Sequence, residues 1–257
     1  MKKLAWNSWI LFLGIVCKGS ISSAKSLPGI LMEGDIMFNA HEDPWDRQRG
    51  PLMGMGINRW PSAVVPFKIN NTAYYSWDLQ VLEAAFKEIE KFSCITFVER
   101  TNEQDYLFIT PYEGCWSFIG RQGSEQVLSL TTPHCINKGT IVHELLHALG
   151  LWHEHSRSDR DEYIDILWNN VVDREKQANF AKHFPEASHF LSFPYDYQSV
   201  MHYDAFAFSK SPQLPTMTPK KPIVRMEDLG RAKKIGTLTE TDKRKINTLY
   251  ECKRSEI

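Results

Sequence analysis

The amino-acid sequence predicts one α+β domain, in which a first half of strands and helices is followed by an irregular second half. At 257 residues, the chain is long enough for one sizeable domain with processing segments, or for two small domains. Strand-like and helix-like patterns alternate from residue 63 to about residue 149, whereas from Ser156 the chain is richer in Pro, Asp and Tyr. No internal repeat is present, so a single domain is the simplest account.

The expected elements follow one another in order. A strand is expected at residues 63–69, where Pro66 suggests an edge position or a kink. An amphipathic helix follows at residues 76–91; Ser76 can cap it, and its apolar side chains recur at helical spacing. Further strands are expected at residues 94–98, 106–109 and 126–131, and a second helix begins near Gly139.

A signal peptide is expected at residues 1–20. Lys2 and Lys3 precede an apolar stretch at residues 4–17, and small residues follow. A charged start, a short apolar middle and small exit residues are typical of secretory leaders. The stretch falls short of the roughly 20 apolar residues that span a bilayer, so no membrane anchor is expected. The chain is therefore expected to be secreted and extracellular.

Residues 21–49 are expected to form a propeptide. They are polar and loop-like, and they end in the basic pair Arg47 and Arg49, a natural cut site for an activating protease of the trypsin or furin type. On composition, a flexible N-terminal arm is the alternative. Residues 50–257 then make up the mature domain.

The cysteines fit an oxidising compartment. Cys17 leaves with the signal peptide, and Cys94, Cys115, Cys135 and Cys252 remain, which suggests two disulfides with three possible pairings. Spacing favours a local loop between Cys115 and Cys135. The triplet that begins at Asn70 is a glycosylation sequon. The formal net charge of −1 argues against a nucleic-acid partner, because such modules are usually strongly basic.

The chemistry is concentrated in residues 143–153. His143 and His147 are four residues apart, so on a helix they lie on one face and can bind one metal ion. Glu144 lies beside them and can accept a proton from water at the metal. Gly150 permits the left-handed turn that ends a helix and brings His153 back as a third ligand. Three imidazoles with an open position are typical of catalytic zinc.

The alternative is a capped helix whose histidines face the core. Against it, four aliphatic residues of the same segment already supply an apolar stripe: Val142, Leu145, Leu146 and Leu149. The histidines are therefore available to bind metal.

This motif resembles that of the metzincin clan of zinc endopeptidases, and the residues after it narrow the likeness to the astacin family. Glu154 directly follows the third histidine, where adamalysins typically carry Asp and serralysins Pro. Residues 199–203 are similar to the astacin Met-turn. The likeness covers essentially the whole chain beyond the signal peptide. It implies a twisted mixed sheet with two long helices in the N-terminal half, and an irregular C-terminal half.

The resemblance implies roles for residues outside the histidine motif. Met201 is expected to form the hydrophobic base beneath the metal, and Tyr203 to be a switchable zinc ligand that stabilises the transition state. Residues 32–36 look like the propeptide motif whose aspartate, here Asp35, ligates zinc in the latent form. The family usually has Phe where this chain has Met32.

Two further expectations follow from the same likeness. The family pairing joins Cys94 to Cys252 and Cys115 to Cys135. The amine released by cleavage near Arg49 or Gly50 is expected to connect through water to Glu154, for which the alternative is a surface carboxylate paired with Arg157. Arg157, Asp159, Arg160 and Asp161 are otherwise expected to form structural ion pairs.

The implied activity is zinc-dependent hydrolysis of peptide bonds in extracellular proteins by an enzyme made as a latent zymogen. The short form looks similar to hatching enzymes, which makes the egg envelope a candidate substrate. Three alternatives remain: a binding protein that keeps the zinc fold without catalysis, a disulfide-stabilised structural protein of the egg coat, and a different zinc hydrolase such as an esterase.

Overall fold

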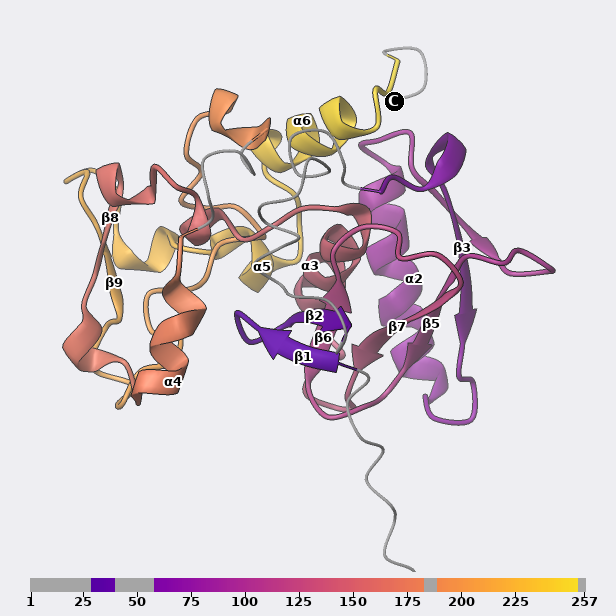
Figure 1. Cartoon of the computed structure of the whole chain (residues 1–257), viewed down its shortest axis with the longest axis horizontal. Coiled ribbons are helices and arrows are strands. Elements are labelled where there is room, and N and C mark those ends of the chain that lie inside the picture. The colour runs from indigo at the N-terminus through magenta and orange to yellow at the C-terminus, as the bar shows by residue number, and fades with distance from the viewer. Residues whose placement is uncertain (1–28, 40–57, 183–188, 254–257) are drawn as a thin grey trace, which may run out of the picture.

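The structure is a computed structural model, and it describes residues 29–39, 58–182 and 189–253. The expected signal peptide at residues 1–20 and the expected cleavage site at Arg47 and Arg49 lie outside these ranges. Within them, a large sheet and its helices occupy the chain up to about residue 150, and shorter elements follow (Figure 1).

The large sheet is mixed and has seven strands. Their order is β1 (Gly29–Met32), β2 (Ile36–Asn39), β6 (Cys115–Phe118), β7 (Glu125–Leu130), β5 (Tyr106–Thr110), β3 (Val64–Ile69) and β4 (Thr96–Glu99). The pairs β1–β2 and β6–β7 are antiparallel, and the other neighbouring pairs are parallel. Strand β2 therefore covers the edge that β6 would otherwise present.

The four expected strands coincide within two residues with β3, β4, β5 and β7, but the hairpin β1–β2 corrects an expectation. Residues 29–39 were expected to be loop-like. Instead Ile36, Met37 and Phe38 are buried, and Met37 packs with Trp116 and Phe118 of β6. The reason is non-local: this short apolar segment becomes a strand because it adds to a sheet built from residues far along the chain.

Pro66 lies in β3, an interior strand of the sheet, so the expected position in an edge strand is wrong. At Pro66 itself, however, only one side of β3 is paired. Its register partner on β4 is Val98, and pairing with β5 on the other side begins only at Phe67. One side of β3 is therefore unpaired at Pro66, where a residue without a backbone N–H is tolerated.

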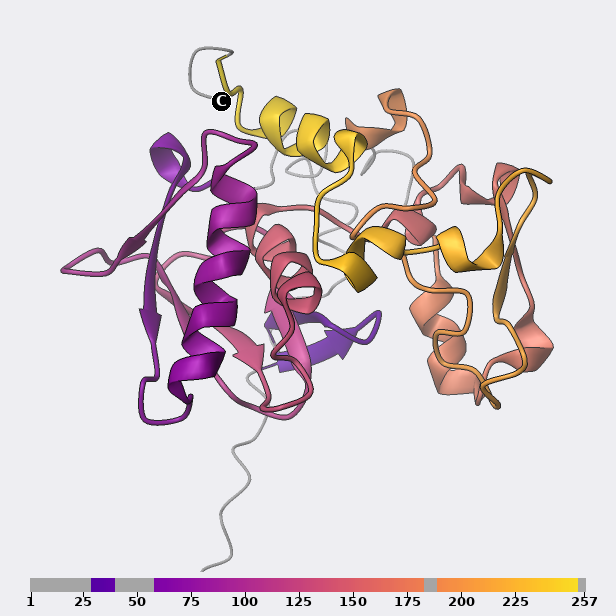
Figure 2. The same ribbon diagram turned by 180° about the vertical axis from the view of Figure 1, so that it is seen from behind.

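Helices α2 (Ser76–Glu90) and α3 (Lys138–Leu149) pack against each other on one face of the sheet, which Figure 2 shows from the helix side. Ser76 is the first residue of α2 and does not cap it. The N-cap is Tyr75, whose backbone N–H donates to the Asp78 carboxylate at 2.9 Å. An acidic side chain suits this end because a helix N-terminus carries partial positive charge.

The second half consists of short elements around a two-stranded antiparallel sheet. The strands are β8 (Ile164–Ile166) and β9 (Met217–Pro219), and the helices are α4 (Arg174–Gln177), α5 (Arg231–Ile235) and α6 (Glu240–Leu249). Single 3-10 turns occur at Pro61–Ala63, Glu154–Ser156, Arg160–Glu162, Trp168–Asn170, Ala178–Phe180, His189–Ser192 and Met226–Asp228.

Helix α6 was not predicted from the sequence. Thr239 caps this helix: its hydroxyl accepts from the backbone N–H of Asp242 at 3.0 Å, and its own N–H donates to the Asp242 carboxylate at 3.1 Å. This reciprocal capping box was the available sequence signal for the helix.

Two disulfides, Cys94–Cys252 and Cys115–Cys135, fasten the fold. The first ties the segment before β4 to the residues after α6, and the second ties β6 to the loop before α3. This is the pairing that the family likeness implies. Among the helices of the described ranges, none has the length and hydropathy needed to cross a bilayer.

Candidate active site

Helix α3 carries the first two candidate ligands. The side chain of Asn137 caps its first turn, and His143 and His147 lie one turn apart on the same face, both fully buried. Gly150 ends the helix in the left-handed conformation at φ 112°, with its N–H donating to the carbonyl of His147 at 2.8 Å. The chain then turns back to His153, which is 1% exposed.

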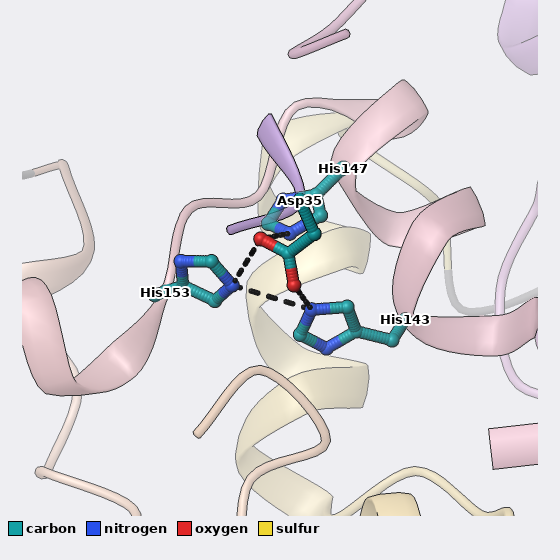
Figure 3. A group of neighbouring side chains, drawn as sticks. All are labelled: Asp35, His143, His147 and His153. Atoms are coloured by element: carbon teal, nitrogen blue, oxygen red, sulfur yellow. Dashed lines mark hydrogen bonds and ion pairs between the residues drawn. The ribbon is translucent and has the colours of Figure 1, made fainter. Parts of the chain in front are cut away.

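The three imidazoles converge on the carboxylate of Asp35, which comes from the turn between β1 and β2 (Figure 3). Asp35 Oδ2 lies 3.1 Å from His143 Nε2; Asp35 Oδ1 lies 3.1 Å from His153 Nε2 and 3.7 Å from His147 Nε2. The Nε2 atoms of His143 and His153 are 3.3 Å apart. One atom from each of the four side chains lies within 4.8 Å of the others.

The hydrogen bonds made by Nδ1 of His143 and His147 determine the tautomers of these rings and leave their Nε2 atoms without a proton. His143 Nδ1–H donates to the carbonyl of Val200, and His147 Nδ1–H to that of Leu151, each at 2.7 Å. In neutral rings the Nε2 atoms then carry lone pairs that face the Asp35 carboxylate. Lone pairs facing an anion repel it unless a cation lies between them, and three imidazole nitrogens are a ligand set that zinc accepts.

Burial keeps the two helix histidines neutral. It lowers the pKa of His143 to about 4, with a further contribution from the charge of Lys233, and it lowers the pKa of His147. At His153, burial acts in the same direction, but the nearby carboxylates of Asp35 and Glu33 outweigh it and raise the pKa to about 9. The site thus encloses a positive ring together with carboxylates, and a cation could take the place of the proton on His153 Nε2.

Glu144 is 1% exposed, and neither of its carboxylate oxygens has a hydrogen-bond partner among the residues that the structure describes. Burial, and after it the negative charge of Asp35, raise its pKa well above the usual value. A buried carboxylate without partners is costly to fold, so its retention next to three imidazoles points to a chemical role. A raised pKa suits a group that accepts and returns a proton.

Glu33 is a site residue that was not predicted from the sequence. Its carboxylate lies 2.6 Å from His153 Nδ1 and accepts from the hydroxyl of Ser156 at 3.1 Å. Its main-chain conformation is left-handed, at φ 48°. In the next residue, Gly34, a Cβ atom would lie 2.6 Å from the ring of Phe208, so only glycine fits this turn. Glu33 lies within residues 32–36, which resemble the propeptide motif. Nothing in the local sequence, however, indicates its contact with His153, 120 residues away.

Tyr203 lies beside the imidazoles, but its hydroxyl oxygen is not one of the converging ligand atoms. Its ring packs 4.7 Å from that of His153, centroid to centroid, and its hydroxyl donates to the backbone carbonyl of Glu33. Burial raises the pKa of Tyr203, followed by the charge of Asp35, so the phenol stays protonated. Met201 is 1% exposed and belongs to the main apolar core.

Glu154 is buried rather than on the surface, at 2% exposure. Its carboxylate accepts from Arg157 Nη1 at 2.9 Å and also pairs with Lys245 of α6. Burial alone would raise its pKa, but these two cations hold it below the usual value. The pairing with Arg157 is present, but the alternative of a surface carboxylate is wrong because α6 covers this position, and the expected link to a new N-terminal amine stays a prediction. Ion pairs also join Arg157 to Asp159 and Arg160 to Asp161.

A cleft of about 500 Å³ opens next to Asp35 and Tyr203. Lys233 and Lys234, from α5, are among the residues that line it. The candidate site is therefore reached from an open recess beside the metal-ligand cluster, whose lining also includes the carboxylate of Asp204.

Comparisons with known proteins agree with this geometry. A sequence model of Astacin, a peptidase family, matches residues 53–251. The chain is 40% identical over 208 residues to "Zinc metalloproteinase nas-12" of Caenorhabditis elegans, covering 78% of this chain and 51% of that protein. It is 38% identical over 245 residues to the "Astacin-like metalloendopeptidase" of Mus musculus, covering 93% of this chain and 52% of that protein. The chain thus spans about half the length of these curated relatives.

A solved structure is also similar. High choriolytic enzyme 1, described as a hatching enzyme zinc-protease from the medaka fish Oryzias latipes, superimposes with a TM-score of 0.68 at 36% sequence identity. The match covers 76% of this chain and 94% of that one. The family match spans more than half of the chain and includes the three imidazoles, Glu144 and the segment 199–203. The chain therefore belongs to the astacin family of peptidases, and its three converging histidines are the candidate ligands of the zinc ion that this family binds.

Proposed function

We propose that this chain is a secreted zinc-dependent endopeptidase that hydrolyses peptide bonds of extracellular proteins and is made as a latent precursor. The observation that carries the proposal is the convergence of three buried imidazole nitrogens beside Glu144, a buried carboxylate without a partner among the described residues. His143, His147 and His153 would hold the zinc. When bound, zinc acts as a Lewis acid that polarises a peptide carbonyl and makes nearby water more acidic.

Glu144 and Tyr203 supply the remaining chemistry. Glu144 takes a proton from the attacking water and returns it to the nitrogen of the departing amine, which its raised pKa favours. Tyr203, protonated because burial raises its pKa, donates a hydrogen bond to the oxygen on which negative charge develops. For this, its hydroxyl must first leave the carbonyl of Glu33.

Latency follows from the same contacts. The carboxylate of Asp35 fills the space between the three imidazoles, and the carbonyl of Glu33 engages the hydroxyl of Tyr203. While the β1–β2 hairpin remains in place, neither a water molecule nor a peptide carbonyl has room there. Residues 21–49 would therefore act as a propeptide that an activating protease removes after Arg49.

Secretion and substrate are supported by separate observations. Two disulfides suit an oxidising compartment, and the sequon at Asn70 lies in a partly exposed turn after β3, where glycosylation would require Asn70 Nδ2 to leave the hydroxyl of Thr110. The medaka neighbour is described as a hatching enzyme, which makes egg-envelope protein the first substrate to test. Of the charged residues that line the cleft, Lys233 and Lys234 outnumber Asp204 once Asp35 is removed, which favours acidic side chains in a bound peptide.

The experiment compares the processed wild-type protein with Glu144→Gln. Both are expected to bind one zinc ion per chain, because Glu144 is not among the converging ligands, while the substitution lowers peptide hydrolysis by orders of magnitude. An exposed control, Glu83→Gln, should leave both quantities unchanged. Zinc-free wild-type protein, or full hydrolysis by the Glu144 variant, would exclude the proposed mechanism.

A further inference from the structure

Asp242, at the start of α6, is a buried carboxylate outside the metal-ligand cluster. It is 0% exposed. Besides its capping bond to Thr239, its Oδ1 accepts from the hydroxyl of Ser199 at 2.6 Å and its Oδ2 from the backbone N–H of Val200 at 3.0 Å. Two of its hydrogen bonds are therefore made to a turn more than 40 residues earlier in the chain.

That turn contacts one candidate zinc ligand, His143, and the residue that follows another. The carbonyl of Val200 accepts from His143 Nδ1–H at 2.7 Å, and the carbonyl of Met201 accepts from the backbone N–H of Glu154, the residue after His153, at 2.9 Å. Within the turn, the hydroxyl of Ser199 also accepts from the backbone N–H of Met201 at 3.0 Å. A continuous set of hydrogen bonds thus runs from the first turn of α6 to the imidazole of His143.

We propose that Asp242 is a positioning residue, which orients His143 for zinc by fixing the carbonyl of Val200. This inference rests on the proposed zinc site. A ligating imidazole is held in direction and tautomer by the acceptor at its outer nitrogen, and losing such an acceptor typically weakens metal binding about 10–100-fold. Residues 199–201 form a turn outside any helix or strand, so their carbonyls are only as fixed as their anchors. The partial positive charge at the N-terminus of α6 stabilises the ionised anchor.

A purely structural role must be separated from this one, and the chain offers a matched control. Asp78 has the same place in the first turn of α2, where its carboxylate accepts from the backbone N–H of Tyr75, but it makes no bond to residues 199–201. Loss of a capping carboxylate is therefore common to Asp78→Asn and Asp242→Asn. Only the second substitution disturbs the acceptor of His143.

The experiment measures the zinc dissociation constant of the full-length secreted chain by competition with a chromophoric chelator, together with the melting temperature. Asp242→Asn is expected to raise the dissociation constant about tenfold or more, and Ser199→Ala several-fold. The double variant is expected to be weaker than wild type by less than the product of the two single effects, since both act on one turn. Asp78→Asn is expected to lower the melting temperature and leave the dissociation constant unchanged.

Substitution of Co²⁺ for zinc gives a second readout. The visible spectrum of bound Co²⁺ reports ligand geometry, and it is expected to change in Asp242→Asn but not in Asp78→Asn. If Asp242→Asn fails to fold, Ser199→Ala still decides the question, because it leaves the capping of α6 intact. Wild-type affinity and spectrum in Ser199→Ala and Asp242→Asn would overturn the inference while leaving the proposed enzyme standing. A wild-type chain that binds no zinc would remove the proposed function itself.

Discussion

Glu33→Gln tests whether latency depends on more than Asp35. The substitution keeps the size of the side chain and the backbone carbonyl that engages Tyr203, but it removes the negative charge beside His153. The carboxylate lies 2.6 Å from His153 Nδ1 and 3.1 Å from the hydroxyl of Ser156, and Glu33 is only 4% exposed. The change therefore weakens the charge-assisted contacts between the hairpin and the site, of which the one to His153 is the shorter.

The expected magnitude follows from that contact. A hydrogen bond to a charged group is worth about 1.5–3 kcal/mol. At about 1.4 kcal/mol for each factor of ten, its loss shifts the balance between the closed and open hairpin roughly 10–150-fold toward the open form. Basal activity of the uncut precursor is expected to rise by the same factor, up to the activity of the processed enzyme.

The assay uses precursor in which Arg47 and Arg49 are replaced by Ala, so that the chain stays uncut, and follows hydrolysis of a quenched fluorescent peptide. Asp35→Ala serves as the positive control and Glu83→Gln, an exposed glutamate paired with Lys87, as the negative one. If Asp35→Ala raises basal activity and Glu33→Gln leaves it at the wild-type level, the reasoning about Glu33 is wrong.

Three further outcomes are expected. Burial alone would raise the pKa of Glu88, but its bonds to Thr237 and Lys138 lower it; the stabilisation is therefore present above the usual pKa near 4.5 and lost as the pH falls through the lower folded value. In urea titrations, Glu88→Gln should cost about 1–3 kcal/mol at pH 7 and lose this deficit once the pH falls below the lowered pKa of Glu88. A deficit independent of pH would contradict the assignment. Replacing Cys94 and Cys252 by Ser opens a loop with a sequence separation of 158, and it should lower the free energy of unfolding by about 5 kcal/mol. Removing the shorter Cys115–Cys135 disulfide should lower it by about 3 kcal/mol. Calorimetry that ranks the two losses in the reverse order would refute the chain-entropy estimate. Removal of zinc by a chelator should lower the melting temperature, and zinc at 100 times its dissociation constant should restore about 2.7 kcal/mol; no shift would argue against metal in the folded protein.

The sequence predicted what depends on local spacing. The interval between His143 and His147, and the glycine three residues after the second, determine a helix face and a turn, so the ligand set could be derived before any contact was known. Strand patterns near residues 64–69 and 106–110 were equally local.

What the sequence could not supply were contacts between distant segments. Residues 36–38 form a strand because β6 accepts them, and Glu33 matters because the β1–β2 turn places it at His153. A surface position was the alternative for Glu154, and nothing in its sequence neighbourhood indicates that α6 and Lys245 cover it. In each case the missing information was which remote residue fills the space.

In the proposed activation, the packing of β2 on β6 determines how quickly the precursor becomes active. Ile36, Met37 and Phe38 are at most 3% exposed, and burying a large apolar side chain stabilises by about 1.5–3 kcal/mol. A cut after Arg49 breaks one peptide bond but none of these contacts, so the severed strand stays bound until it dissociates. Nicked protein should therefore show a lag before full turnover, and departure of the strand leaves the main-chain groups of β6 open to pair with an extended peptide.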